Sequence, residues 1–158
     1  MYMDDREKQG LENLLTDCRV ATLAILIEDG PFASLVPFAM TNGFGTALIH
    51  ASSLAKHSAG LTPGAPFSLL IHEPDTQPET NPAQLARATL LGSVEPLAKD
   101  SDAYSQARDQ YLAKFPKSQI TFQLGDFTLF ALQVESCRFV AGFGKAFDVA
   151  LDQLADLA

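Results

Sequence analysis

The strand-like segments at the start of this chain are joined by connections that allow only antiparallel pairing. Residues 19–28 (RVATLAILIE) are apolar and β-branched, and a tight turn at Asp29-Gly30-Pro31 leads into residues 31–40 (PFASLVPFAM). Asn42-Gly43 marks a second turn before residues 46–52 (TALIHAS). A parallel crossover takes a dozen residues or more, so each of these strands is predicted to run antiparallel to the one before it.

The rest of the chain continues this pattern, with helices at its margins. Three more strands are predicted at residues 65–72, 86–97 and 126–136, with a bulge at Gly92 and a continuation through residues 137–147 until Gly142 and Gly144 interrupt it. Helices are predicted at residues 4–16, 52–61 and 100–114, a solvated loop at 73–82, and a short helix or frayed end at 148–158. These elements predict a mainly β fold of the α+β class, an antiparallel six-stranded barrel with peripheral helices, in a single domain over residues 1–158.

Composition narrows the class of partner. A length of 158 residues suits one domain, and every apolar run is far shorter than the ~18–20 residues that cross a bilayer. The 11 Lys and Arg residues against 19 Asp and Glu residues give a net charge of −8, which argues against nucleic acid as the main partner. Cys18 and Cys137 make no disulfide framework, so reduced thiols in the cytoplasm are expected, with one long-range disulfide as the alternative.

Two of the strands alternate poorly between apolar and polar residues. They are residues 19–27 (RVATLAILI) and residues 65–71 (APFSLLI). Strands of this kind are covered on both faces, here by the barrel core on one side and by a partner chain on the other. The pattern therefore favours a dimer.

The segment from residue 50 to residue 57 (HASSLAKH) is the most informative candidate for a ligand site. If a helix starts here, Ser52 or Ser53 caps it, and its free N–H groups and the Lys56 ammonium form a cradle for an anion such as phosphate. The plainer interpretation is that a serine only caps the helix and that Lys56 is a solvated surface residue. Arg87, within an otherwise apolar strand, either lies in water at an edge or faces an anionic ligand.

The other reactive side chains form no catalytic or metal-binding motif. His50, His57 and His72 lack the helical spacing of a zinc site and have no clustered carboxylates or thiols near them. No nucleophile elbow occurs, so we assign neither a catalytic residue nor a metal ligand. No βαβ unit follows Gly142-Phe143-Gly144, so it is not a dinucleotide fingerprint. Phe143 is expected to be buried in a tight bend, with an aromatic that binds a ligand as the alternative.

Five segments, in order along the chain, resemble the pyridoxamine phosphate oxidase-related superfamily of flavin-binding split barrels. They are ATLAILIEDGPFASLVPFAM, HASSLAKHSAGL, SLLIHEP, ARATLLGSVEPL and VESCRFVAGFGKAF. The LAKH turn and the GFGKA segment are similar to those of its heme-utilisation branch. The resemblance covers residues 11–148 and implies that the barrel is of the split type.

The resemblance also implies a cofactor and its site. Members of this superfamily are homodimers that bind flavin mononucleotide (FMN) at the subunit interface. Carried over to this chain, the cofactor-binding residues are Ser34, Leu35, Val36, Pro37, Ser52, Ser53, Lys56, His57 and Arg87. Of these, Ser52, Ser53 and Lys56 match the turn that holds the phosphate. Ser34 lies where pyridoxamine phosphate oxidases place a phosphate-binding arginine.

The function implied by the resemblance is that of an FMN-binding oxidoreductase acting on a small molecule. Vitamin B6 oxidases place an arginine and a histidine near the C-terminus on the substrate phosphate, but this chain has GFGKAF there, so that substrate is not expected. Two alternatives stay open. One is a heme-binding or heme-utilisation protein, and the other is a dimer that binds a cofactor or ligand without catalysis.

Overall fold

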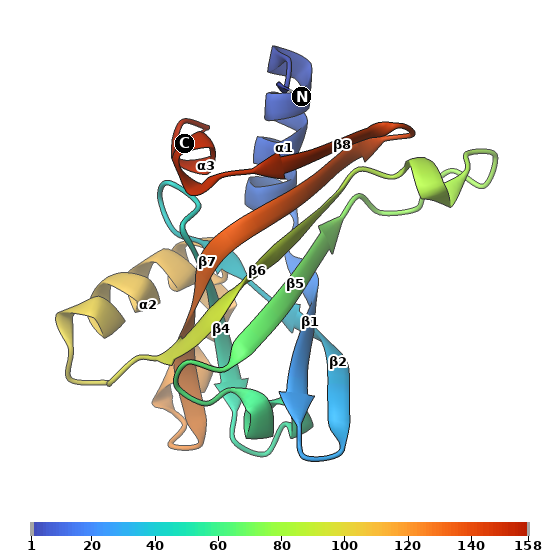
Figure 1. Cartoon of the computed structure of the whole chain (residues 1–158). Coiled ribbons are helices and arrows are strands. Elements are labelled where there is room, and N and C mark those ends of the chain that lie inside the picture. Colours follow the sequence, from blue (N-terminus) through green and yellow to red (C-terminus); the bar gives the residue numbers. More distant parts are fainter. Residues whose placement is uncertain (1, 158) are drawn as a thin grey trace.

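The computed structural model describes residues 2–157 and shows one antiparallel sheet curled into a half-barrel (Figure 1). The strand order is β2-β1-β5-β6-β7-β4-β3, and β8 pairs with β7. The strands are β1 (Val20–Ile27), β2 (Gly30–Pro37), β3 (Ala39–Met40), β4 (Thr46–Ser52), β5 (Pro66–His72), β6 (Arg87–Pro96), β7 (Phe127–Gly142) and β8 (Lys145–Val149). All neighbouring pairs are antiparallel, which confirms the predicted fold class.

The described residues form eight strands rather than the six predicted, because two predicted strands are each divided. The 31–40 segment breaks at Phe38, whose N–H donates to the Arg19 carbonyl oxygen (3.2 Å), and β3 then pairs with β4. The 137–147 segment breaks at Gly142 and Gly144, whose φ angles of 137° and 75° lie in the region that favours glycine. This second break reverses the chain from β7 into β8.

The turn between β7 and β8 carries Phe143 at its tip. Gly142 pairs with Lys145, which leaves Phe143 and Gly144 as the two loop residues. The expectation that Phe143 is buried is wrong, since its side chain is 84% exposed. A two-residue hairpin loop extends beyond the last cross-strand pair, so its first residue has no strand to pack against.

Alternate residues of the strands fill the barrel interior. In β1, Leu23 and Ile25 are at most 3% exposed, whereas Thr22 between them is only partly buried. In β5, Leu69 and Ile71 are fully buried in the same way. Successive side chains of a strand point to opposite faces, so the sheet has an inner face in the core and a second face directed away from it.

Helix α1 (Asp5–Asp17) confirms the prediction for residues 4–16 to within one residue. Asp4 and Glu7 cap its start reciprocally, because each carboxylate accepts the other residue's N–H at 2.8 Å. Glu7 Oε1 also accepts from Lys145 Nζ at 2.7 Å, which joins the helix to β8. Its apolar side chains enter the barrel core at Leu11, Leu14 and Leu15.

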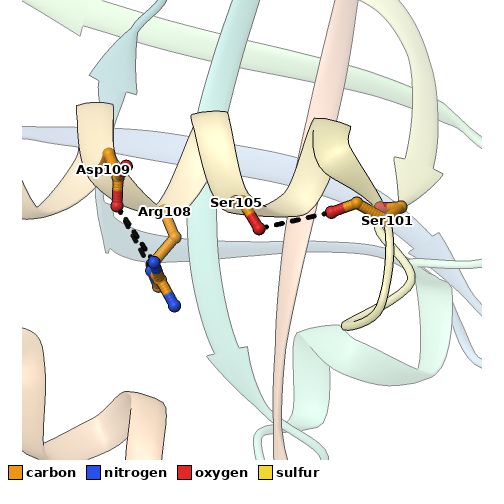
Figure 2. A network of polar contacts seen from close by, with 4 residues as sticks. All are labelled: Ser101, Ser105, Arg108 and Asp109. Atoms are coloured by element: carbon orange, nitrogen blue, oxygen red, sulfur yellow. Dashed lines mark hydrogen bonds and ion pairs between the residues drawn. The ribbon is translucent and has the colours of Figure 1, made fainter.

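Helix α2 (Asp102–Lys114) confirms the prediction for residues 100–114 and packs on the side of β4 and β7 opposite the barrel interior. Ser101 Oγ accepts from the Tyr104 N–H at 3.1 Å and so begins the helix. Figure 2 shows two exposed contacts, from Ser105 Oγ to the Ser101 carbonyl oxygen (3.5 Å) and between Arg108 and Asp109 (3.2 Å). An exposed ion pair stabilises little. The helix is therefore held chiefly by its buried residues, Tyr104, Ala107 and Tyr111.

The prediction of a helix over residues 52–61 is wrong for the start of this segment, because backbone groups there form hydrogen bonds with other partners. Ser58 Oγ donates to the Ser52 carbonyl oxygen (2.6 Å), and the Ser53 N–H donates to the Asp126 carbonyl oxygen (2.7 Å). Such bonds compete with helix formation, and only a five-residue 3-10 helix follows, η1 (Lys56–Gly60). Its N-cap is Ala55, so neither serine caps a helix.

The loop after β5 and the C-terminal tail follow the predictions, whereas two further 3-10 helices were not predicted. Residues 73–82 form an exposed loop, which leads into the short 3-10 helix η2 (Pro82–Gln84). A further 3-10 helix, η3 (Pro116–Gln123), follows α2, and the tail forms α3 (Leu151–Ala155) with Leu154 buried. Between residues 2 and 157, no helix has the length and apolar character needed to cross a membrane.

The bulge predicted at Gly92 is present, and it generates a stability prediction. The register between β6 and β7 shifts at this residue, and a Cβ there would collide with the Gln133 carbonyl oxygen. We expect Gly92→Ala to lower the free energy of unfolding by roughly 3 kcal/mol in urea denaturation. Gly45→Ala is the control, because nothing lies within 4 Å of the added Cβ. Equal stability of the two variants would contradict the close approach.

Candidate functional site

The turn that was expected to hold a phosphate already contains a carboxylate. Ser52 Oγ donates to Asp126 Oδ2 at 2.6 Å and accepts from the Leu54 N–H at 3.1 Å. A dianion at this hydroxyl would face the Asp126 carboxylate and be repelled by it. The exposed Ser53 lies in the same turn, and η1 begins only at Lys56. The turn therefore lacks the helix N-terminus on which the predicted phosphate cradle depended.

Lys56 and His57 both contact strand β2. The Lys56 ammonium lies 5.4 Å from the centre of the Phe32 ring, a cation–π contact. His57 Nδ1 lies 3.0 Å from Ser34 Oγ. Burial lowers the pKa of His57, so its imidazole is neutral at pH 7. Three predicted site residues, Ser34, Lys56 and His57, thus meet where η1 packs on β2.

Strand β2 divides the predicted stretch Leu35, Val36 and Pro37 between two environments. Val36 is 4% exposed and belongs to the barrel core, whereas Leu35 is 69% exposed. Pro37 is exposed on the same side of the strand as Leu35. Only Leu35 and Pro37 are therefore accessible to a ligand through their side chains.

The side of the sheet that carries Leu35 is a second candidate region, with few charged side chains. Beyond its bulge at Gly92, β6 carries the exposed Glu95. We use the name outer face for the residues of β2, β1, β5 and the part of β6 before this bulge that point away from the core: Pro31, Ala33, Leu35, Pro37, Val20, Thr22, Ala24, Leu26, Pro66, Ser68, Leu70, His72, Arg87, Thr89 and Leu91. None of them is acidic, although the chain carries a net charge of −8. In Figure 1 no α-helix passes in front of these four strands.

Strand register arranges the outer face in rows. One row across the four strands consists of Leu35, Thr22, Leu70 and Thr89, and the next consists of Ala33, Ala24, Ser68 and Leu91. Neighbouring strands lie about 4.8 Å apart, so four strands present a surface roughly 14 Å wide. Leu35 is 69% and Leu26 59% exposed, so apolar side chains remain in contact with water there.

At one end of the outer face, His72 and Arg87 are cross-strand partners. Arg87 Nη1 donates to the carbonyl oxygens of Ala83 and Leu85, both at 3.1 Å. Within residues 2–157 its Nε and Nη2 groups make no hydrogen bond, which leaves donors for a carboxylate or a phosphate. His72 is exposed, and its Nδ1 lies 2.6 Å from the Glu73 carbonyl oxygen. Sequence reasoning identified Arg87 but attached no role to His72.

An aromatic cluster around His50 also escaped sequence reasoning. The His50 ring stacks on Phe122, with 3.8 Å between ring centres and 10° between planes. The Tyr111 and Phe127 rings lie 6.1 Å and 5.0 Å from it. These neighbours come from α2, η3 and β7, far from His50 in the chain, so no local pattern could reveal them.

The His50 imidazole is held in one neutral form. Thr121 Oγ1 donates to the Ser118 carbonyl oxygen, so it accepts from His50 Nδ1 at 3.2 Å. Burial lowers the pKa of His50 to about 4, because charge is poorly solvated among the rings. His50 is therefore a packed, uncharged residue under α2 and η3.

Both cysteines are free thiols, as expected. Cys137 lies in the barrel core, and burial raises its pKa to about 12. Burial also raises the pKa of Cys18, whose Sγ donates to the His72 carbonyl oxygen at 3.7 Å. A protonated thiol is a poor nucleophile, so neither cysteine is activated. Within residues 2–157, no three His, Cys, Asp or Glu side chains gather as a metal site would require.

Comparison with known proteins gives a family and a relative. The family model described as "CREG, beta-barrel" matches residues 13–155. A protein of Vibrio cholerae named heme oxygenase HutZ is 32% identical over 127 residues, which make up 80% of this chain and 70% of that protein.

Solved structures share the fold. The structure of a heme binding protein from Mycobacterium smegmatis has a TM-score of 0.82 at 25% identity and covers 98% of this chain. ChuZ from Campylobacter jejuni has a TM-score of 0.78 at 20% identity and covers 95% of this chain, a likeness of fold alone. The chain spans 62% and 61% of the lengths of these two proteins.

The low pKa of His50 generates a prediction about pH. Unfolding raises this pKa from about 4 to 6.5, so between these values the unfolded chain binds the extra proton. The stability due to neutral His50 is therefore present above pH 6.5 and is lost as the pH falls toward 4. Urea denaturation at about pH 7 and pH 4.5 should show the wild type losing about 2 kcal/mol more than His50→Phe. Parallel losses in the two proteins would contradict this, since His57 titrates in both.

Proposed function

The chain belongs to the CREG β-barrel family, and on that basis we propose that it is a heme-binding protein of the heme-utilisation type. The outer face carries the proposal, because it is an exposed apolar surface without acidic residues and has the Arg87 guanidinium at one end. Two similar proteins, HutZ and the Mycobacterium smegmatis protein, are named for heme.

The side chains of the outer face suit heme chemically. Heme is a flat, largely apolar ring with two carboxylates, so it favours a wide apolar surface with a cation beside it. The row from Leu35 to Thr89 supplies the surface, and Arg87 supplies the cation. An acidic side chain on this surface would repel the carboxylates, and the outer face has none.

A flat sheet covers only one side of a ring, so we propose that a second copy of the chain covers the other. Contiguous exposed apolar surface is typical of protein–protein contacts, and Leu26 and Leu35 are both more than half exposed on the outer face. This arrangement is a homodimer with the cofactor at the subunit interface. It also accounts for the poor alternation of β1 and β5, since both faces of these strands are then covered.

FMN is the less favoured ligand, which reverses the order expected from the resemblance. Its phosphate was expected at the turn of Ser52, where the Asp126 carboxylate now accepts the hydroxyl. Heme places its carboxylates beside Arg87 and needs no anion site at that turn. Of the predicted phosphate contacts, Ser53 and Lys56 are exposed.

The protein's share of the chemistry is then limited to binding and orientation. When bound, heme supplies the redox chemistry of its iron. An oxidoreductase acting on a small molecule, as the resemblance implied, therefore needs no nucleophile from the chain. The apolar outer face would exclude water from one side of the ring, and Arg87 would hold a carboxylate of the heme.

Heme binding is tested by titration. We expect the purified protein to take up heme and to develop a Soret band. Arg87→Ala should raise the dissociation constant roughly 10-fold, the loss of about one charge-assisted hydrogen bond. Lys117→Ala, which removes an exposed cation on η3, is the matched control and should bind as the parent does. Absence of a Soret band together with uptake of FMN would overturn the proposal in favour of the flavin alternative.

Dimerisation is tested by a charge on the outer face. Leu35→Glu places a carboxylate in the proposed interface and should raise the dimer dissociation constant roughly 100-fold, as measured by sedimentation equilibrium. Leu54→Glu is the control, because Leu54 is 88% exposed but lies in the turn before η1. A wild type that is monomeric at micromolar concentration would refute the interface.

A further inference from the structure

We propose that His72 would bind the heme iron, an inference that rests on the proposed function and names the residue of this chain that would hold the metal. His72 ends β5 and points to the outer face, directly across from Arg87 on β6. The side chain is exposed, so the structure leaves its ring accessible to a ligand lying on that face.

The hydrogen bond of His72 selects the form of imidazole that binds a metal. A carbonyl oxygen only accepts, so Nδ1 carries the proton that is shared with the Glu73 carbonyl oxygen at 2.6 Å. In the neutral ring, the lone pair is then on Nε2. A histidine that donates one ring N–H to a carbonyl while the other nitrogen binds the metal is the usual arrangement in metal sites.

The surroundings of His72 match the parts of a heme. Leu70 precedes it by two residues on the same face and belongs to the row of Leu35, Thr22, Leu70 and Thr89, where the ring would lie. Arg87 is the residue opposite and has free Nε and Nη2 donors for a carboxylate. One ligand, one apolar surface and one cation thus come from neighbouring positions of β5 and β6.

The other two histidines of the chain are less accessible. His50 is stacked against Phe122 at 3.8 Å and lies under α2 and η3, so an iron atom would have to displace packed rings. His57 is half-buried between η1 and β2, and its Nδ1 lies beside the Ser34 hydroxyl. The proton of this hydrogen bond can be on His57 Nδ1 or on Ser34 Oγ. The chain has three histidines in all. Single substitutions of these three histidines would therefore show which of them binds the iron.

Neither cysteine is as suitable a ligand for the iron as His72. Cys137 is buried in the core beneath the sheet. Cys18 is close to His72, but its thiol donates to the His72 carbonyl oxygen and burial raises its pKa. A thiol in this state is a weaker ligand than a neutral imidazole, since iron binds the thiolate.

The test compares His72→Ala with His57→Ala in the full chain loaded with ferric heme. We expect the wild type and His57→Ala to show the absorption and electron paramagnetic resonance spectra of histidine-ligated heme. His72→Ala should lose those spectra and bind heme at least about 10-fold more weakly. Added imidazole should restore the spectra of His72→Ala, which separates loss of a ligand from loss of the fold.

The outcomes separate this inference from the proposed function. If the wild type binds no heme, the proposed function fails and the inference fails with it. If the wild type has histidine-ligated heme and His72→Ala keeps the same spectra, the inference is overturned while heme binding stands. Loss of those spectra in His57→Ala or His50→Phe instead would likewise assign the ligand elsewhere.

Discussion

The whole sheet depends on the pairing of β7 with three other strands. One edge of β7 bonds to β6 along residues 130–140, and the other bonds to β4 at residues 127–133 and then to β8. Both edges are therefore occupied, and the open edges of the sheet fall on β2 and β3. Because β2 and β3 do not pair with each other in the described residues, the barrel stays split. In Figure 1 no α-helix passes in front of the broad surface of β2, β1, β5 and β6.

Most of the fold could be predicted from local patterns, because hairpin spacing and a period of two are local properties. The errors arose where residues distant in sequence decide the outcome. The 52–61 helix is lost to bonds that include the Asp126 carbonyl oxygen, which lies more than 60 residues away. β3 separates from β2 because the chain changes partner after Phe38, from β1 to the later strand β4. The error at Phe143 is different, because it arose from a local feature, the hairpin that leaves Phe143 and Gly144 as loop residues.

The candidate site was harder to predict, because its members come together through strand register. Lys56 and Arg87 could be singled out as cations in otherwise apolar stretches. The position of His72 opposite Arg87 depends on the pairing of β5 with β6, and sequence spacing does not show it. The Asp126 carboxylate beside Ser52 is likewise contributed by a distant segment, 74 residues along the chain. The poor alternation of β1 and β5 was the one local signal of the outer face.

Side chains of β1 and β5 point alternately into the core and outward, and this has a consequence for how the protein can evolve. Leu23, Ile25, Leu69 and Ile71 face the core, while Thr22, Ala24, Ser68 and Leu70 face outward. The two sets share a backbone but point into separate environments, so an outward substitution adds or removes no side-chain atoms in the core. The outward residues can therefore change while the core side chains are kept. One scaffold can in this way acquire different ligands by single mutations, without passing through an unfolded intermediate.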